Sequence, residues 1–133
     1  MDCIFCKIAN GEIPCKKVAE NDLAVAFLDL SPVSDGHTLV IPKKHSENLS
    51  STDEEVLAGV FALVKEVTKK IYNSSLKPVG FNYVSNEGSE AGQMVFHFHV
   101  HVIPKYNKEE GFLGTCKPVT SKSLDEVLEK INK

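Results

Sequence analysis

Three histidines alternate with apolar residues where residues 97–101 read His-Phe-His-Val-His. On a β-strand alternate side chains share a face and lie about 6.6 Å apart, at roughly 3.3 Å per residue. We therefore expect a strand over residues 95–103, ended by Pro104, with three imidazoles on one face and an apolar opposite face that packs into the core. The imidazole face consists of His97, His99 and His101, and the core face of Phe98, Val100 and Val102.

Three interpretations of this histidine row are open. The histidines can lie on an exposed strand without a function, or they can form a structural or storage metal site. The third interpretation is phosphorus chemistry, because a neutral imidazole is a nucleophile near neutral pH, with an unperturbed pKa of about 6.5. Such a ring attacks phosphorus and holds the phosphoryl group as a phosphoramide, while neighbouring imidazoles orient it or move protons.

Two further segments make the pattern more specific. Residues 36–45 read GHTLVIPKKH, and the loop over residues 86–93 reads NEGSEAGQ. Together with residues 97–103, in this order along the chain, they resemble the motifs of the histidine triad (HIT) family. The resemblance extends from about residue 3 to residue 104.

The resemblance implies a role for each matching position. His99 would carry the nucleotidyl group, His101 would contact the phosphate, and His37 would lie behind them as a further polar partner. His97 is the first histidine of the triad. The base pocket would comprise Ile4, Phe5, Ile8, Phe27 and Leu30. The ribose contact would be Asp29, and the phosphate loop would contain Asn86, Gly92, Gln93 and Met94.

These assignments have plainer alternatives. Asp29 precedes a Ser-Pro turn and is compatible with an ordinary loop residue, and the apolar residues are compatible with ordinary core. Met94 departs from family members that carry Ser or Thr at this position. One hydrogen bond to the phosphate or leaving group is then missing, which puts the preferred leaving group in doubt.

Cys3 and Cys6 have the two-residue spacing of a zinc site or a redox pair. In metal-bearing branches of the family that the chain resembles, the partners are positions that correspond to His45 and His97. We expect a structural zinc held by Cys3, Cys6, His45 and His97; the alternatives are free cysteines or a redox pair. If His97 binds metal it cannot also move a proton.

Composition narrows the class of protein. The chain has 133 residues, a net charge of −3 and no Arg, since all fifteen basic residues are Lys. We expect one domain, a HIT core over about residues 3–104 followed by an extension over residues 105–133. We expect no nucleic-acid partner, because no large basic patch is indicated, and no bidentate guanidinium grip on phosphate. Because residues 1–3 lack a secretory pattern and no apolar run approaches membrane length, we expect a cytoplasmic protein without a membrane partner.

The hydrophobic pattern predicts an α+β fold with a largely antiparallel sheet. One long helix is expected after Thr52, which can cap it with Glu55 three residues later. A short final helix is expected after the capping box that begins at Ser123. The apolar stripe of the long helix comprises Val56, Val60, Phe61, Val64, Val67 and Ile71, and that of the final helix Leu124, Val127, Leu128 and Ile131. The expected strands span residues 17–20, 23–28, 37–41, 81–84 and 95–103.

These expectations lead to one principal function and two alternatives. The principal one is hydrolysis of purine nucleoside phosphoramidates, such as AMP–amine conjugates, through a nucleotidyl-His99 intermediate. The first alternative is hydrolysis of dinucleoside polyphosphates, and the second, from another class, is a nucleotide-binding or scaffold protein with little turnover. Nucleotidylyltransferase, DNA-repair and decapping relatives fit less well, since they have a different motif or extra domains. HIT proteins of this size are usually homodimers, which the resemblance also implies here.

Overall fold

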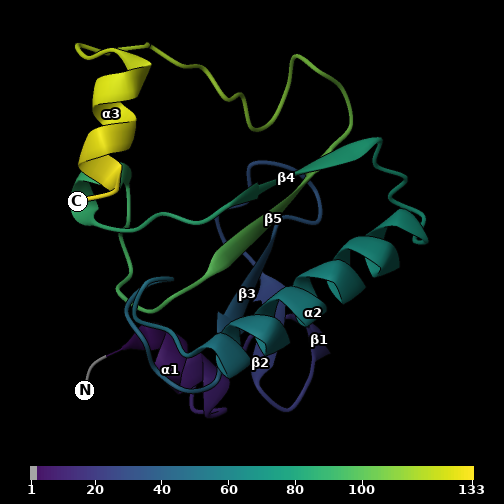
Figure 1. Ribbon diagram of the computed structural model, residues 1–133. Coiled ribbons are helices and arrows are strands. Elements are labelled where there is room, and N and C mark those ends of the chain that lie inside the picture. The colour runs from purple at the N-terminus through teal and green to yellow at the C-terminus, as the bar shows by residue number, and fades with distance from the viewer. Residues whose placement is uncertain (1–2) are drawn as a thin grey trace.

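The computed structural model describes residues 3–133 and contains one antiparallel sheet with helices on both faces (Figure 1). The sheet has five strands in the order β1-β2-β3-β5-β4. This is the expected α+β architecture. The elements are α1 (Ile4–Ala9), β1 (Lys17–Glu20), β2 (Ala24–Leu28), β3 (Thr38–Pro42), α2 (Glu54–Tyr72), β4 (Gly80–Val84), the short 3₁₀ helix η1 (Ser89–Ala91), β5 (Val100–Lys105) and α3 (Leu124–Ile131).

The period-two alternation of β2 and β3 divides the core into two layers. Ala24, Ala26 and Val40 face α2 and pack against its buried side chains. Val25 and Phe27, with Leu39 and Ile41, face the opposite side and pack against α1. The α2 layer also holds Phe98, Val100 and Val102, as the alternation around the histidines predicts. The imidazoles therefore lie on the α1 side of the sheet.

Helix α2 begins one residue later than its expected cap implies. Asp53 is the N-cap, and its side chain makes no capping hydrogen bond. Thr52 is buried instead, and its hydroxyl donates to the carbonyl of Asn48 at 2.6 Å. Phe61, expected in the core, is 44% exposed, while Leu63 is buried. Leu63 is three residues after Val60, so helical geometry returns it to the core face, whereas Phe61 is rotated by about 100° from Val60.

Strand β5 is shorter at its start and longer at its end than expected. It begins at Val100, so His97 and His99 precede the regular ladder, and it continues through Pro104. Pro104 is compatible with the strand because the register pairs it with Phe81 of β4, while β3 begins only at Thr38, opposite Val102. A proline disrupts a sheet where a neighbouring strand needs its missing N–H. The Pro104 carbonyl, which points to the same side as that N–H would, accepts from the Ser34 hydroxyl at 2.7 Å, beyond the end of the β3 ladder.

The C-terminal segment ends in α3, and the predicted N-cap, Ser123, is confirmed. The Ser123 hydroxyl accepts a hydrogen bond from the Glu126 amide at 3.2 Å. The helix buries none of its residues, and its apolar stripe faces outward, with Leu124 87% exposed. In Figure 1 it stands at the end of a long extended segment. Among residues 3–133, no helix has the length and apolar character needed to cross a bilayer.

Candidate active site and metal cluster

Two loops that are distant in sequence are held together where β3 ends and β5 begins. The Phe98 amide donates to the carbonyl of Ser46 at 2.7 Å, and the Gln93 side-chain amide donates to the carbonyl of Glu47 at 2.6 Å. These hydrogen bonds hold the segment before β5 against the segment after β3. They bring His97 beside His45, 52 residues earlier in the chain.

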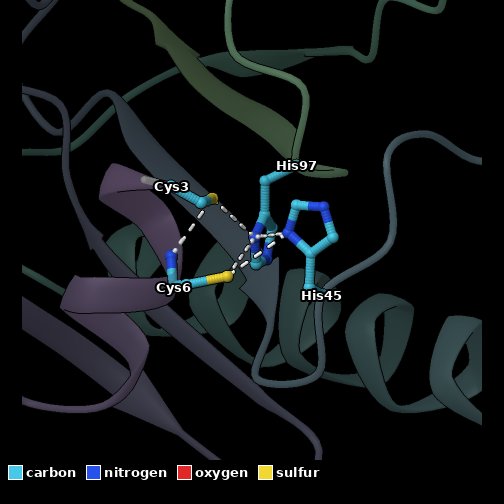
Figure 2. A group of neighbouring side chains, drawn as sticks. All are labelled: Cys3, Cys6, His45 and His97. Atoms are coloured by element: carbon cyan, nitrogen blue, oxygen red, sulfur yellow. Dashed lines mark hydrogen bonds between the residues drawn. The ribbon is translucent and has the colours of Figure 1, made fainter. Parts of the chain in front are cut away.

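Figure 2 shows Cys3, Cys6, His45 and His97 pointing toward one another. The two sulfurs come from the N-cap and first turn of α1. Cys3 Sγ lies 3.3 Å from His97 Nδ1, Cys6 Sγ lies 3.3 Å from His45 Nδ1 and 3.5 Å from His97 Nδ1, and the two Nδ1 atoms are 3.2 Å apart. The structure thus brings together the four residues that the sequence predicts as metal ligands.

These spacings fit a tetrahedral zinc ion. Zn–N and Zn–S bonds of about 2.05 and 2.3 Å give tetrahedral edges of about 3.3 Å for N···N and about 3.6 Å for S···N. The observed range of 3.2–3.5 Å is close to both. The His97 ring also has the required tautomer, because its Nε2–H donates to the Pro42 carbonyl at 2.9 Å and leaves Nδ1 bare toward the cluster.

The thiols of the cluster also fit a cation. Burial, and then the neighbouring Cys3 sulfur, raise the pKa of Cys6 to about 11. A divalent cation between the sulfurs would reverse this, because a coordinating thiol is deprotonated by the metal. The cluster is therefore able to hold a metal ion.

His99 has a tautomer fixed by backbone geometry. Its Nδ1 lies 2.7 Å from the carbonyl oxygen of His97, and a carbonyl only accepts, so Nδ1 carries the proton. The lone pair of the neutral ring is then on Nε2. Ser85 secures the other side of this residue, since its hydroxyl donates to the His99 carbonyl at 2.8 Å. His99 thus presents one basic nitrogen in a fixed orientation.

His101 is the first histidine that lies on the β5 ladder, and it pairs with both neighbouring strands. Its Nδ1 is 2.9 Å from Nε2 of His37, and Asp29 Oδ2 is 3.5 Å from the same His37 nitrogen. Burial lowers the pKa of His37, and it lowers the pKa of His101 to about 4, with the neighbouring rings of His99 and His37 acting in the same direction. Both side chains are therefore neutral at pH 7.

A cleft of about 600 Å³ opens beside His99 and His101. It is lined by all five residues expected in the base pocket and by Asp29, Asn86, Gly92 and Met94. Phe5 and Phe27 are buried walls, whereas Leu30 and Met94 are 93% and 89% exposed at the rim. His37 is not among the lining residues and contacts His101. Lining residues that the sequence argument missed are Ile13, Pro14, Cys15, Lys16, Leu28, Ser31, Leu39 and Val95.

The loop before the histidines is held by its own residues. Gln93 is buried; its side-chain oxygen accepts from the Gly88 amide at 2.9 Å, while its nitrogen bonds Glu47 as above. Gln93 therefore braces this loop through its side chain. Gly92 has φ +97°, a conformation that favours glycine, and an added Cβ would meet the Asn86 side chain at 3.3 Å. Asn86 and Gly92 of the same loop line the cleft.

A family model described as HIT domain matches residues 10–108. The chain belongs to the HIT domain family. It is 51% identical over 130 residues to an uncharacterized HIT-like protein of Mycoplasma genitalium, covering 98% of this chain and 92% of that protein. It is 46% identical over 127 residues to the adenosine 5'-monophosphoramidase of Schizosaccharomyces pombe, covering 96% and 91%.

Solved HIT structures share the fold. A HIT family protein from Bacillus anthracis has a TM-score of 0.87 at 43% identity, covering 98% of this chain and 92% of that one. A zinc-bound histidine triad family protein from Mycobacterium smegmatis has a TM-score of 0.77 at 38% identity, covering 82% and 78%. These comparisons confirm the expected family and HIT-like fold.

Half of the missed cleft residues lie in one HIT-domain segment, residues 13–16 between α1 and β1. No motif marks this segment, since Ile13-Pro14-Cys15-Lys16 combines an apolar pair with a thiol and a lysine. The β1–β2 pairing is a signal that could have found it. The Leu28 amide bonds the Lys16 carbonyl, which places residue 16 beside the strand that leads into Asp29.

Proposed function

We propose that this protein is a nucleotide hydrolase that transfers the nucleotidyl group of a purine nucleoside phosphoramidate to His99 and then to water. The observation that carries the proposal is the bare Nε2 of His99 on the wall of an apolar cleft, fixed by the hydrogen bond from Nδ1 to the His97 carbonyl. A nucleophile held in its reactive tautomer needs no deprotonation before it attacks phosphorus. The monophosphoramidase of S. pombe supports this reaction class.

The cleft supports binding of a nucleoside at the end away from the reacting phosphorus. A purine would lie against Phe5, Ile8 and Phe27, whose apolar surfaces it removes from water. Asp29 lies at the same cleft and its Oδ1 already accepts the Ser31 amide at 2.8 Å, which orients the carboxylate. A carboxylate has lone pairs left for two ribose hydroxyls.

In the proposed first step, Nε2 of His99 forms a bond to the α-phosphorus and the bond from phosphorus to the leaving nitrogen breaks. The His97 carbonyl, still bonded to Nδ1–H, stabilises the positive charge that develops on the ring. His101 and the loop of Asn86 and Gly92 are positioned to bind phosphate oxygens. In the second step water attacks phosphorus and loses one proton to solvent, the P–N bond to His99 breaks, and its electron pair returns to Nε2 of the free imidazole. This proton balances the one that the leaving amine takes up in the first step.

The charge of the cleft favours an amine over a polyphosphate as leaving group. Among its lining residues in the described chain Lys16 is the only lysine, and His101 is neutral at pH 7. A nucleoside polyphosphate would bring several negative charges to this rim. Dinucleoside polyphosphate hydrolysis is the alternative, and Met94, which offers no hydroxyl to the leaving group, does not exclude it.

A substrate panel with a trapping experiment tests the function. Purified protein is compared on AMP–amine conjugates and diadenosine polyphosphates, and rapid quench with labelled substrate is used to trap a nucleotidyl-protein adduct. We expect faster turnover of the amine conjugates and an acid-labile adduct on the peptide that contains His99. Brisk turnover without an adduct would exclude the covalent route. A protein that binds AMP but turns over none of the panel would favour the scaffold alternative.

We also propose that Cys3, Cys6, His45 and His97 hold a structural zinc. The donor spacing and the His97 tautomer support this, as does the zinc-bound M. smegmatis structure. When bound, zinc would supply a cross-link between α1 and the segment that carries the histidines, without direct chemistry on substrate. Since the site needs two reduced thiols, a cytoplasmic location is the compatible one.

The β4 edge of the sheet supports a homodimer. Strand β4 ends the strand order, so its outer backbone groups have no strand partner within residues 3–133. Exposed aromatic side chains lie on this strand and on α2, with Tyr83 and Phe61 51% and 44% exposed. We propose that two chains pair along this side. Sedimentation equilibrium checks this, and a monomer at micromolar concentration would contradict it.

A further inference from the structure

The His37 ring is oriented by a backbone amide that the histidine motif does not contain. The Val33 N–H donates to Nδ1 of His37 at 3.2 Å, and His37 is only 4% exposed. An amide N–H is only a donor, so Nδ1 must carry a lone pair. A neutral His37 therefore has its proton on Nε2, and an imidazolium, which has donors on both nitrogens, would oppose the Val33 amide.

This tautomer determines that of His101. Nε2 of His37 lies 2.9 Å from Nδ1 of His101, and with its proton it donates across this contact. Nδ1 of His101 is then the acceptor, and the proton of the neutral His101 ring lies on Nε2. Asp29 Oδ2, 3.5 Å from His37 Nε2, is an acceptor as well and leaves the direction unchanged.

We propose that Val33 and His37 lock His101 as a hydrogen-bond donor toward the cleft that cannot supply a net proton to the leaving group. His37 is a positioning residue in this scheme, since it acts on the substrate only through His101. The proposal rests on the hydrolase function above and assigns different roles to His99 and His101. His99 supplies the electron pair, and His101 stabilises negative charge on the phosphate oxygens.

His101 cannot supply a net proton because no group in the chain Val33–His37–His101 can replace the proton that it would lose. If His101 gave up its Nε2 proton, its Nδ1 would have to take the Nε2 proton of His37. His37 would then need a proton on Nδ1, where the Val33 amide points its own N–H. The relay would end in an imidazolate, which a neutral site near pH 7 does not support. The chain Val33–His37–His101 is therefore closed to net proton transfer.

The leaving group must then obtain its proton elsewhere. When the phosphorus–nitrogen bond breaks, its electron pair stays on the leaving nitrogen, which becomes a neutral amine only by gaining one proton. In this scheme the nitrogen takes that proton from solvent water at the open rim, where Met94 is 89% exposed. The substrates best suited to the site have a leaving nitrogen basic enough to be protonated before the bond breaks.

A second metal site at the same residues fits less well. Asp29, His37 and His101 have ligand atoms within 4.8 Å of one another, which is close enough for one ion. A metal on His37 Nε2 would displace the proton to Nδ1, against the Val33 amide at 3.2 Å. The backbone donor therefore favours the hydrogen-bond relay over a metal ion.

The test reads the tautomer directly. Protein with zinc retained, labelled with ¹⁵N at histidine, is studied by long-range ¹H–¹⁵N correlation at pH 7, which separates protonated from bare ring nitrogens. We expect His101 with a proton on Nε2 and a bare Nδ1. A proton on His101 Nδ1, alone or in an imidazolium, would overturn the proposal. This spectrum needs no substrate, so it can fail while the hydrolase function stands, and a missing His99 adduct would do the reverse.

Two substitutions with opposite polarity extend the test. In His37→Gln the side-chain N–H can still donate to His101, whereas in His37→Glu a carboxylate accepts and places a proton on His101 Nδ1. We expect the Gln variant to keep the His101 tautomer and a rate within about tenfold of wild type. At a pH where the ¹⁵N spectrum shows a neutral His101 in the Glu variant, this variant should lose about 10²–10³-fold in kcat, the cost of an oxyanion donor, because the proton on Nδ1 leaves Nε2 bare toward the cleft.

Two substrates with different leaving groups distinguish charge stabilisation by His101 from acid catalysis by His101. The Glu variant should lose activity equally on an AMP–amine conjugate and on AMP p-nitrophenyl ester, whose leaving group needs no proton. A loss confined to the amine conjugate would mean that His101 is the general acid, and the proposal would be wrong. If the Glu variant does not fold, the wild-type spectrum alone decides.

Discussion

The Nδ1 nitrogen of His99 lies 2.7 Å from the carbonyl oxygen of His97, and His97 is also a member of the metal cluster. One residue therefore contributes a side chain to the cluster and a backbone acceptor to the proposed nucleophile. Its imidazole is held by the Pro42 carbonyl and the cluster, so its carbonyl has little freedom to move. Because the side chain and the carbonyl belong to one residue, contacts of the cluster with the His97 ring also limit the movement of the carbonyl that orients the His99 ring.

Replacing His99 with Ala should abolish hydrolysis while AMP binding survives. The ring supplies the bond to phosphorus, so the loss should span several orders of magnitude, each tenfold step corresponding to about 1.4 kcal/mol of barrier. The cleft walls Phe5 and Phe27 are unchanged in this variant. Steady-state kinetics and calorimetric titration with AMP measure the two properties. Retention of more than a few per cent of the wild-type rate would exclude His99 as the nucleophile.

Replacing Cys3 with Ser should remove most of the bound zinc and lower the melting temperature. Cys3 is the N-cap of α1 as well as a cluster member, so its loss frees the helix from the histidine segment. Elemental analysis of protein purified without chelator should give about one zinc per chain for the wild type. Cys116→Ser is the matched control, since Cys116 is exposed and outside the cluster. Equal zinc content in the two variants would refute the site.

The sequence predicts which residues form the site better than it predicts the backbone conformation that positions them. Cys3 and Cys6 follow from their spacing, His45 and His97 follow from the resemblance to the HIT family, and the two faces around Phe98 follow from alternation. The break in β5 before Val100 does not, because it depends on hydrogen bonds from Phe98 and Gln93 to the segment after β3. Propensity over residues 95–99 favours a strand, and these tertiary contacts override it.

Other features depend on single atoms that a residue pattern does not specify. His37 was expected behind the triad, but its orientation comes from the Val33 amide in a loop of ordinary composition. Thr52 is a good cap by type, yet its hydroxyl is used by Asn48 and Ser46, and Asp53 takes the cap position. The direction of a hydrogen bond is thus visible only in the structure.

Stability should fall as pH decreases from 7 to 5. The pKa of His101 is lowered from 6.5 to about 4 by burial and by His99 and His37. Below pH 6.5 the unfolded chain binds a proton at this residue that the folded chain does not, so unfolding becomes more favourable as pH falls toward 4. The paired carboxylate of Glu20, with a pKa of about 2, loses its contribution only below about pH 4.5.

Thermal melts at pH 7 and pH 5 measure this difference. His101→Gln is the comparison, because it removes the titrating ring and keeps a polar side chain. We expect the melting temperature of the variant to fall less between pH 7 and pH 5 than that of the wild type. Part of the fall should remain in the variant, because the pKa of His37 is also lowered. The same loss in both proteins would show that His101 does not contribute.

Replacing Gly59 with Ala should destabilise the protein, although Ala is the better helix former. Propensity alone favours Ala by about 1 kcal/mol within a helix. At this position a Cβ would lie 2.7 Å from Leu23 Cβ, and the Gly59 carbonyl accepts a hydrogen bond from Asn21. Overpacking of about 1–3 kcal/mol should exceed the propensity gain. Gly80→Ala is the control, since nothing lies within 4 Å of its added Cβ, and denaturant unfolding compares the two.

Asp29→Ala should raise KM for ribonucleotide substrates and narrow the difference from deoxyribonucleotides. The carboxylate lies at the cleft with Oδ1 fixed by the Ser31 amide, so its remaining lone pairs are the acceptors available to the 2′- and 3′-hydroxyls. Asp29 also lies 3.5 Å from His37 Nε2, so a change in kcat alone would indicate a role in the relay and none in ribose binding. Equal effects on ribo- and deoxyribonucleotides would contradict ribose recognition.

The same arrangement of the cleft predicts how the leaving group affects KM and kcat. In the proposed binding mode, apolar walls such as Phe5 and Phe27 and the carboxylate of Asp29 would contact the nucleoside, and the leaving group would lie near the exposed Met94. Binding then depends on the part that all substrates share, and chemistry depends on the part that differs. A series of AMP–amine conjugates should show similar KM values and kcat values that follow the basicity of the amine, since KM reflects binding when bond breaking is slow. A series in which KM changes and kcat stays constant would place specificity at the leaving group.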